Sequence, residues 1–171
     1  MVSCTTRSDS EDTEVVETVS GWQQVSKINM TISWRVTANT KLEMKVEGPT
    51  TGWVGVGLVP EGENTLMKNV NFVMGSVEGQ TVSISDCFGV HSMGMPTEDS
   101  EQNVSNKSGE EVSGATSIQF RVPLESPDTE QDYNIIANKK YTILMAYSTS
   151  DSLSSQHTAR ASAHDIVLIT E

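Results

Sequence analysis

Short stretches in which apolar and polar residues alternate recur along most of this chain. In residues 30–37, apolar Ile32 and Trp34 alternate with polar neighbours, and residues 41–47 and 118–124 repeat the pattern. Successive side chains of a β-strand point to opposite faces of the sheet, so a period of two predicts strands with one buried face. About eight to ten strands joined by irregular loops predict an all-β fold, an antiparallel, immunoglobulin-like β-sandwich.

The other expected strands have less regular patterns. They are expected over residues 53–59, 70–77, 81–85, 141–147 and 165–169. The turn residues 78–80 predict a hairpin between the second and third of these, and the continuously apolar 141–147 is typical of a central strand. The polar stretch 89–114 is expected to be a long loop. No segment of the sequence predicts a helix.

The charge of the chain excludes two classes of partner. A chain of 171 residues is expected to form one main domain, and its formal net charge is −12. Phosphate backbones and anionic membrane surfaces both require clustered lysine and arginine, so we expect no nucleic acid partner and no docking on such a membrane. No apolar run reaches about 18 residues, so direct membrane insertion is not expected.

The N-terminal segment differs in composition from the remainder. Residues 1–19 are polar and acidic and are expected to be a disordered leader, with the folded domain over residues 20–171. The leader lacks the apolar core of a signal peptide.

Two further features concern the compartment. Cys4 and Cys87 can form one disulfide if the protein is secreted, although the sequence alone does not pair them. Sequons at Asn29, Asn103 and Asn106 permit glycosylation, which would make a secreted form a glycoprotein.

Glycines interrupt the strand expected at residues 53–59. Gly55 and Gly57 alternate with Val54 and Val56. Glycine weakens a strand interior and marks either a packing bulge or the close approach of another group. The sequence leaves both readings open: a bulge, or room for a flat ligand against the sheet.

An ordered set of short signals resembles the DOMON family of extracellular β-sandwich domains. The resemblance covers roughly residues 20–169, and the order of the signals is more specific than any one of them. The signals are Ile32-Ser33-Trp34, Gly52-Trp53-Val54-Gly55-Val56-Gly57, Met67 to Gly75, Asp86-Cys87-Phe88, Pro96 to Asp99 with Gln102, Phe120-Arg121, Asp128 to Asp132, Ala146-Tyr147 and His157 to Arg160. Asn71 and Ala161 depart from the family, which often has Asp and Gly at these positions.

The resemblance implies a site as well as a fold. In some DOMON domains a methionine and a histidine ligate a b-type haem, and here they correspond to Met67 and His157, with His164 as the rival histidine. Methionine and histidine are a known axial pair of haem iron. The two residues lie far apart in the chain, and we expect loops from both sheets to bring them together at one end of the sandwich. The expected apolar walls are Val54, Val56, Phe72, Met74 and Met145.

This resemblance implies a one-electron carrier rather than an enzyme with its own catalytic site. Its redox partner would be a membrane b-type cytochrome or an oxidoreductase domain, and its location would be extracellular. Two alternatives remain open: a non-redox module that binds a glycan or a protein, and an accessory domain of a copper-dependent monooxygenase.

Simpler readings of the same residues also remain open. Methionine commonly fills core gaps, and a histidine before a strand can bond a backbone carbonyl. His91, Met93 and Met95 resemble a soft copper-binding cluster in the polar stretch. Asp128, Glu130 and Asp132 resemble the start of a calcium loop, but Tyr133 replaces the glycine that such a loop requires, which favours a surface acidic turn.

Overall fold

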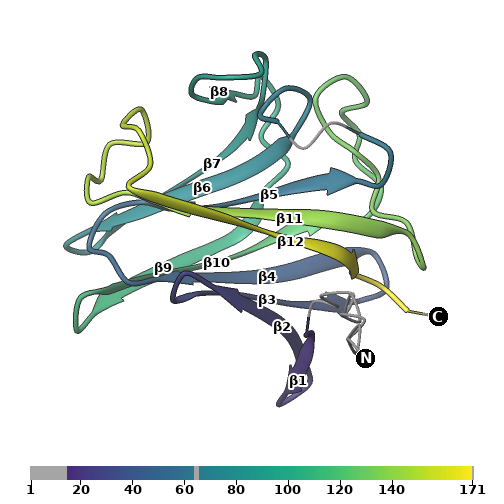
Figure 1. Cartoon of the computed structure of the whole chain (residues 1–171), viewed down its shortest axis with the longest axis horizontal. Coiled ribbons are helices and arrows are strands. Elements are labelled where there is room, and N and C mark those ends of the chain that lie inside the picture. The colour runs from purple at the N-terminus through teal and green to yellow at the C-terminus, as the bar shows by residue number, and fades with distance from the viewer. Residues whose placement is uncertain (1–14, 64–65, 171) are drawn as a thin grey trace, which may run out of the picture.

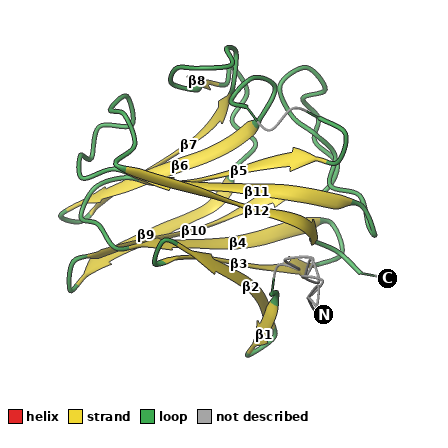
Figure 2. Ribbon diagram, in the orientation of Figure 1, coloured by secondary structure: helices red, strands yellow, loops and turns green. Residues whose placement is uncertain are grey.

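Two antiparallel sheets pack face to face in this protein (Figure 1). The structure is a computed structural model and describes residues 15–63 and 66–170. Within these ranges it contains twelve strands and no helix (Figure 2). The all-β sandwich expected from the alternating patterns is therefore confirmed.

Each sheet has six strands. In sheet order, the first sheet consists of β1 (Glu17–Val19), β2 (Trp22–Lys27), β3 (Met30–Thr37), β4 (Lys41–Gly48), β10 (Ala115–Pro123) and β9 (Ser105–Val112). The second sheet consists of β12 (Ala159–Val167), β11 (Lys140–Tyr147), β5 (Val54–Pro60), β6 (Asn71–Glu78), β7 (Thr81–Phe88) and β8 (Thr97–Glu98).

Three details of the expected organisation are wrong. The described residues contain more strands than the eight to ten expected. The boundary of the acidic leader falls inside a hairpin, because Glu17–Val19 forms β1 and pairs with β2. The rest of the leader, residues 1–14, lies outside the described residues. The polar stretch 89–114 is not one loop, because it contains the short β8 and the eight-residue edge strand β9.

Tight turns with left-handed backbone join several strand pairs. Ser20 and Gly21 link β1 to β2 with φ values of 52° and 81°, and Ser113 and Gly114 link β9 to β10 with φ values of 54° and 81°. Two consecutive residues with positive φ match the type I′ turn, whose twist suits antiparallel hairpins. These turns fix the register of the strands that they join.

The main core lies between the sheets. Residues that alternate along each strand fill it, among them Ile32 and Trp34 of β3, Phe120 of β10 and Ile143 of β11, all fully buried. The indole Nε1 of Trp34 donates to the carbonyl of Leu168 at 3.1 Å, which ties the chain after β12 to the core. No helix in the described ranges is long and apolar enough to cross a membrane.

Candidate functional site

The outer face of the second sheet carries a second apolar cluster. Its buried members are Trp53, Val59, Val70, Phe72, Met74 and Cys87, and Met67, Met95, Leu144, Ala146 and Leu153 pack against them. An outward sheet face is usually polar, so a buried apolar cluster there requires cover from loops. Three connections supply that cover, β5–β6 with Met67, β7–β8 with Met95 and β11–β12 with Leu153, and an open groove of about 600 Å³ lies between them.

Apolar side chains and glycines form most of the lining of the groove. Its floor is formed by Gly55 and Gly57 of β5 and by the neighbouring Phe72, Met74, Leu144 and Ala146. Met67 and Met95 line it on one side, and His157 and Arg160 line it on the other. The groove is therefore mainly apolar, with a few polar or metal-ligating groups at its margin, as ligand sites commonly are.

Gly57 keeps the floor of the groove flat. A Cβ atom at this position would lie 2.6 Å from Cε1 and 2.7 Å from Cδ1 of Phe72, which is closer than real Cβ contacts allow. At Gly55 the nearest atom would be Cγ of Met74 at 3.2 Å. The sequence left two explanations for these glycines, a bulge or the close approach of another group. At Gly57 the second holds, because the ring of Phe72, the residue paired with Gly57 on the neighbouring strand β6, packs closely against it.

Backbone contacts hold the connection that carries Met67. Asn69 N donates to Gly89 O at 2.7 Å, and Gly89 N donates to Val70 O at 2.9 Å. A Cβ atom on Gly89 would overlap the carbonyl oxygen of Met67, so only glycine fits there. The β7–β8 connection thus determines where the half-buried Met67 lies.

Trp53 anchors the connection that carries His157. Its indole Nε1 donates to Oγ of Ser155 at 2.9 Å and to the carbonyl of Ser155 at 3.3 Å. The same connection is fixed at its ends, where Trp53 N donates to Ser150 O at 3.0 Å and Thr158 N donates to Tyr147 O at 2.7 Å. The half-buried His157 therefore belongs to a loop held from both sides.

The two connections approach the groove from opposite ends of the same sheet. β5 and β11 are antiparallel neighbours, with Pro60 opposite Tyr141 and Val54 opposite Tyr147. The β5–β6 connection with Met67 therefore starts at one end, and the β11–β12 connection with His157 starts at the other. The expectation that loops from both sheets meet at one end of the sandwich is wrong.

The structure separates the expected wall residues. Phe72 and Met74 line the groove. Val54 and Val56 do not, because their side chains point into the core between the sheets, so the expectation for these two is wrong. Met145 borders the groove but is only 1% exposed and belongs to the same core.

The rival histidines lie elsewhere. His164 is exposed on β12, where its ring is hydrogen-bonded to Oγ1 of Thr142 at 3.1 Å and Oγ of Ser162 at 2.9 Å. Neither His164 nor His91 is among the residues that line the groove, whereas Met93 and Met95 are.

Sequence reasoning missed the anchoring role of Trp53 and the presence of Arg160 in the groove. Both lie within motifs that the sequence displays, the Gly-Trp-Val-Gly strand and the His-x-x-Arg segment. Their positions in the sequence, Trp53 beside the glycine-containing strand and Arg160 three residues after His157, could have indicated both roles.

Cys87 is a free, buried thiol in the outer cluster. Burial, followed by the charges of Asp99 and Asp86, raises its pKa to about 12. The thiol is therefore protonated at neutral pH and unreactive. Its expected partner, Cys4, lies outside the described residues.

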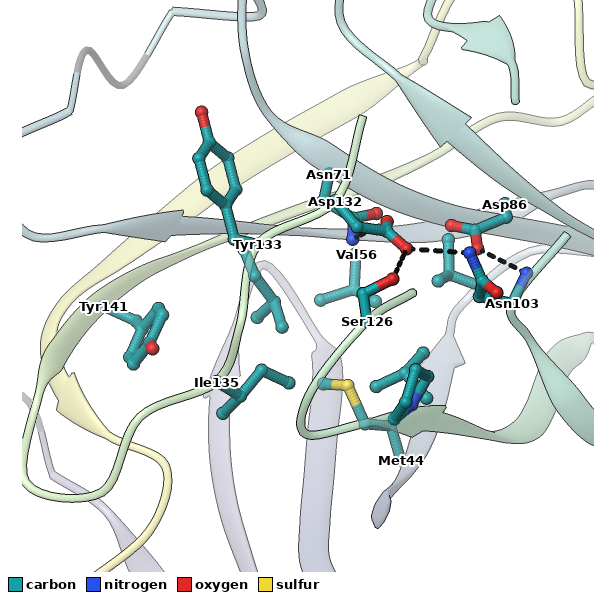
Figure 3. A pocket seen from close by; sticks show the side chains of 14 residues that line it. Met44, Val56, Asn71, Asp86, Asn103, Ser126, Asp132, Tyr133, Ile135 and Tyr141 are labelled. Carbon is teal, nitrogen blue, oxygen red and sulfur yellow. Dashed lines mark hydrogen bonds between the residues drawn. The ribbon is translucent and has the colours of Figure 1, made fainter. Parts of the chain in front are cut away.

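Three aspartates meet at the end of the main core. Two of them, Asp86 and Asp132, line a small cavity of about 30 Å³ (Figure 3). Asp86 lies in β7, Asp99 follows β8, and Asp132 lies in the β10–β11 connection. One carboxylate oxygen of each lies within 4.8 Å of the others. Asp132 was expected in a surface acidic turn, but its side chain is half-buried and points into this cluster.

The electrostatics of these aspartates follow from burial and mutual repulsion. Burial, followed by the charge of Asp132, raises the pKa of Asp86 to about 7. Burial and the charges of Asp132 and Asp128 also raise the pKa of Asp99 to about 7. Burial raises the pKa of Asp132, opposed by its hydrogen bond from Ser126. Ionising all three carboxyls therefore costs free energy unless positive charge is added.

Comparisons with known proteins agree with this fold. The family model described as DOMON domain matches residues 26–148. No curated protein sequence matches the chain. Among solved structures, the cytochrome b domain of pyranose dehydrogenase from Coprinopsis cinerea superposes with a TM-score of 0.65 at 18% identity, covering 84% of this chain and 80% of that one. The cytochrome domain of Myriococcum thermophilum cellobiose dehydrogenase gives 0.58 at 13% identity, covering 85% and 82%.

Proposed function

Because this chain belongs to the DOMON domain family, we propose that it binds one b-type haem in the groove on the second sheet and carries single electrons. Met67 and His157 are the proposed axial ligands. The observation that carries the proposal is that these residues, far apart in sequence, line one apolar groove from opposite ends of a sheet. Two of the similar solved structures are cytochrome domains, which supports the same reading.

The groove suits a large, flat, apolar group. Its volume of about 600 Å³ lies within the range of roughly 300–1,000 Å³ that is common for ligand pockets. Gly55 adds no side chain to the floor, the ring of Phe72 packs over Gly57, and Phe72 and Met74 supply apolar walls against which a planar ring system could lie. These residues would exclude water from the bound ligand and so surround it with an environment of low polarity.

Met67 and His157 supply chemically suitable donors. A thioether and an imidazole are a known axial pair, and thioether ligation raises the reduction potential of haem iron. The bound haem would supply the one-electron couple. Filling both axial positions with protein ligands disfavours oxygen chemistry and favours simple electron transfer.

Arg160 is the proposed partner of a haem carboxylate. It lines the groove three residues after His157. Within residues 15–63 and 66–170, no ion pair of Arg160 with an acidic side chain is found. A guanidinium in this position can neutralise a carboxylate with paired hydrogen bonds.

We further propose that the electrons pass to or from a partner oxidoreductase domain outside the cell. The similar solved structures come from dehydrogenases, which motivates the class of partner. Asn29 and Asn106 are exposed and open to glycosylation, whereas the amide of Asn103 donates to Asp132 at 3.1 Å and is occupied. Detection of glycans at Asn29 and Asn106, but not at Asn103, would therefore support secretion.

An absorption spectrum tests the proposal directly. Protein produced with haem supplied should show a sharp Soret band, and reduction with dithionite should give split visible bands of a six-coordinate cytochrome. Met67→Ala and His157→Ala should each abolish that six-coordinate spectrum. The matched controls are His91→Ala and His164→Ala, which lie outside the groove lining and should leave the spectrum unchanged.

Other outcomes would overturn the proposal in distinguishable ways. A change confined to the control variants would show that the ligands are misassigned. A protein that stays colourless with added haem would exclude electron transfer and favour the alternative binding module. Glycan binding would then be tested on the same groove, where Trp53 and Phe72 are the available aromatic residues.

A further inference from the structure

We propose that Asp86, Asp99 and Asp132 bind one Ca²⁺ ion, which joins three segments of the chain at the end of the main core. The proposal does not rest on haem binding, because the cluster and the groove are lined by different residues. Three carboxylates alone would not define a cation site. The additional observation is that, within the described residues, the carboxylate of Asp99 is buried without a hydrogen-bond partner.

Asp99 carries the argument. Asp99 is only 5% exposed, and neither Oδ1 nor Oδ2 has a hydrogen-bond partner among residues 15–63 and 66–170. One of its oxygens lies within 4.8 Å of oxygens from Asp86 and Asp132, so the carboxylate points into the cluster. A buried carboxylate without partners costs several kcal/mol if it is ionised. Such an orphaned group indicates a missing ligand.

The neighbouring carboxylates are only partly satisfied. Oδ2 of Asp86 accepts from Asn103 N at 3.1 Å, but Oδ1 of Asp86 is buried without a partner. Asp132 is held by donors, with Asn71 Nδ2 at 2.6 Å from Oδ1 and Asn103 Nδ2 at 3.1 Å from Oδ2 (Figure 3). The cluster therefore combines carboxylate oxygens that hydrogen-bond donors hold in place with carboxylate oxygens that lack a partner. Together they surround a position that a cation could occupy.

No protein cation neutralises the cluster in the described part of the chain. None of the ion pairs found there involves Asp86, Asp99 or Asp132. The charge of Lys107 acts on Asp86, but Lys107 forms no ion pair with it, and its Nζ donates to the carbonyl of Ile84 at 2.8 Å. A bound cation would supply the missing positive charge.

The oxygen donors and their spacing favour Ca²⁺. Carboxylates alone suit hard cations, not the softer metals that prefer imidazole or thiolate. Ligands on opposite sides of Ca²⁺ are about 4.6–5.2 Å apart, whereas those on Mg²⁺ are about 4.0–4.2 Å apart. Separations of at most 4.8 Å lie within the span of one Ca²⁺ coordination sphere.

The site would stabilise the connections around it. The backbone already brings Asp99 to Asp86, because Asp99 N donates to Asp86 O at 3.0 Å. Gln102 holds both residues, with Nε2 donating to Asp86 O at 3.0 Å and Asp99 O at 3.2 Å. Ca²⁺ would add a link from these two segments to the β10–β11 connection through Asp132.

Thermal unfolding of the whole chain with CaCl₂ or EDTA tests the site. Ca²⁺ at 100 times its Kd should raise Tm by roughly 5–10 °C for a domain of this size. Calorimetric titration of EDTA-treated protein with CaCl₂ should give one ion per chain. MgCl₂ at the same concentration should give a smaller rise in Tm.

Asp99→Asn separates a cation site from a merely unfavourable cluster. The substitution keeps the shape of the side chain, breaks no hydrogen bond and removes one negative charge. We expect a higher Tm than the parent protein in EDTA, together with loss of the response to CaCl₂. Glu101→Gln, an exposed change two residues away with the same change in charge, should respond to CaCl₂ like the parent.

Three results would overturn the proposal: no heat of Ca²⁺ binding and no shift of Tm in the parent protein, an undiminished response in Asp99→Asn, or an equal rise with MgCl₂. All of these measurements can be made on protein without haem. Their failure is therefore distinguishable from failure of the proposed electron-transfer function.

Discussion

At the scale of single residues, Gly57 and Gly55 make different contributions to the same strand. A methyl group at Gly57 would meet the buried ring of Phe72 at 2.6 Å, and Val70 Cγ1 at 2.9 Å. Neither a packed ring nor its neighbour can move away easily, so we expect Gly57→Ala to reduce the free energy of unfolding by roughly 1–3 kcal/mol. Urea unfolding of the whole chain measures this change.

Gly55→Ala is the matched control on the same face. The one tight contact of its methyl group would be with the flexible Met74 side chain, at 3.2 Å from Cγ, and its other neighbours lie at ordinary contact distances of 3.5 Å. Alanine also gains roughly 0.5–1 kcal/mol over glycine within a strand, because it loses less conformational entropy on folding. The net change is expected to stay within about 1 kcal/mol. Equal losses for the two variants would contradict the assigned role of the Phe72 ring.

The residue scale also shows what the sequence could not decide at the groove. Alternation in Val54-Gly55-Val56-Gly57 predicts two faces but not which face binds a ligand. We assigned the valines to the wall because a haem slot is apolar, and they pack in the core instead. The family resemblance predicts Met67 and His157 as ligands, which stays a prediction, whereas the groove that they line depends on how the surrounding loops fold.

At the scale of elements, Trp53 links β5 to the connection that carries His157. Trp53→Phe would keep an aromatic ring and remove the Nε1 donor to Ser155. A lost hydrogen bond of this kind costs about 1 kcal/mol. Amide hydrogen exchange in residues 151–158 is expected to become roughly fivefold faster, and haem affinity should fall with it.

Trp34→Phe provides the control for this link. Trp34 Nε1 donates to Leu168 O at 3.1 Å inside the main core, so the same chemical change acts far from the groove. It should lower global stability but leave local exchange in residues 151–158 at the parent level. If both variants loosened this connection equally, Trp53 would have no specific anchoring role.

Strands with a clear apolar alternation were predictable, whereas β9, the longest strand that the sequence did not predict, has no such alternation. The strands β3, β4 and β10 follow their alternating patterns closely. β9 has the sequence Ser-Asn-Lys-Ser-Gly-Glu-Glu-Val and lies at a sheet edge, mostly exposed. Its residues form a strand because they pair with β10, which is a tertiary effect that local polarity does not reveal.

At the scale of the whole molecule, the net charge is −12, so the ionisation of acidic groups affects stability. One acidic group, Glu43, has a buried carboxylate on the outer face of the first sheet. Glu43 is 3% exposed, and its carboxylate accepts from Arg35 Nε at 2.7 Å and Arg121 Nε at 3.0 Å. Burial opposes ionisation, but the hydrogen bonds from the two guanidinium groups outweigh it. The pKa of Glu43 is therefore lowered below its ordinary value.

This lowered pKa predicts how stability depends on pH. As the pH falls, the unfolded chain takes up the proton of Glu43 first, so stability from this residue is complete above pH 4.5, its ordinary pKa, and is lost as the pH falls through the folded pKa. Glu43→Gln cannot titrate. At pH 7 it should be less stable than the parent by roughly 1–3 kcal/mol, since two charge-assisted interactions are weakened.

The contribution of Glu43 is the difference in the free energy of unfolding between the parent protein and Glu43→Gln, because the other acidic groups titrate in both proteins. Urea unfolding at pH 7, 5 and 3.5 should give a gap that is constant down to about pH 5 and narrows below it. Glu47→Gln, which removes only the exposed pair with Lys45, should stay within about 0.5 kcal/mol of the parent at every pH. A gap that stayed constant down to pH 3.5 would mean that the Arg35–Glu43–Arg121 network does not hold the carboxylate ionised. The acid sensitivity of the sandwich would then have to come from other carboxylates.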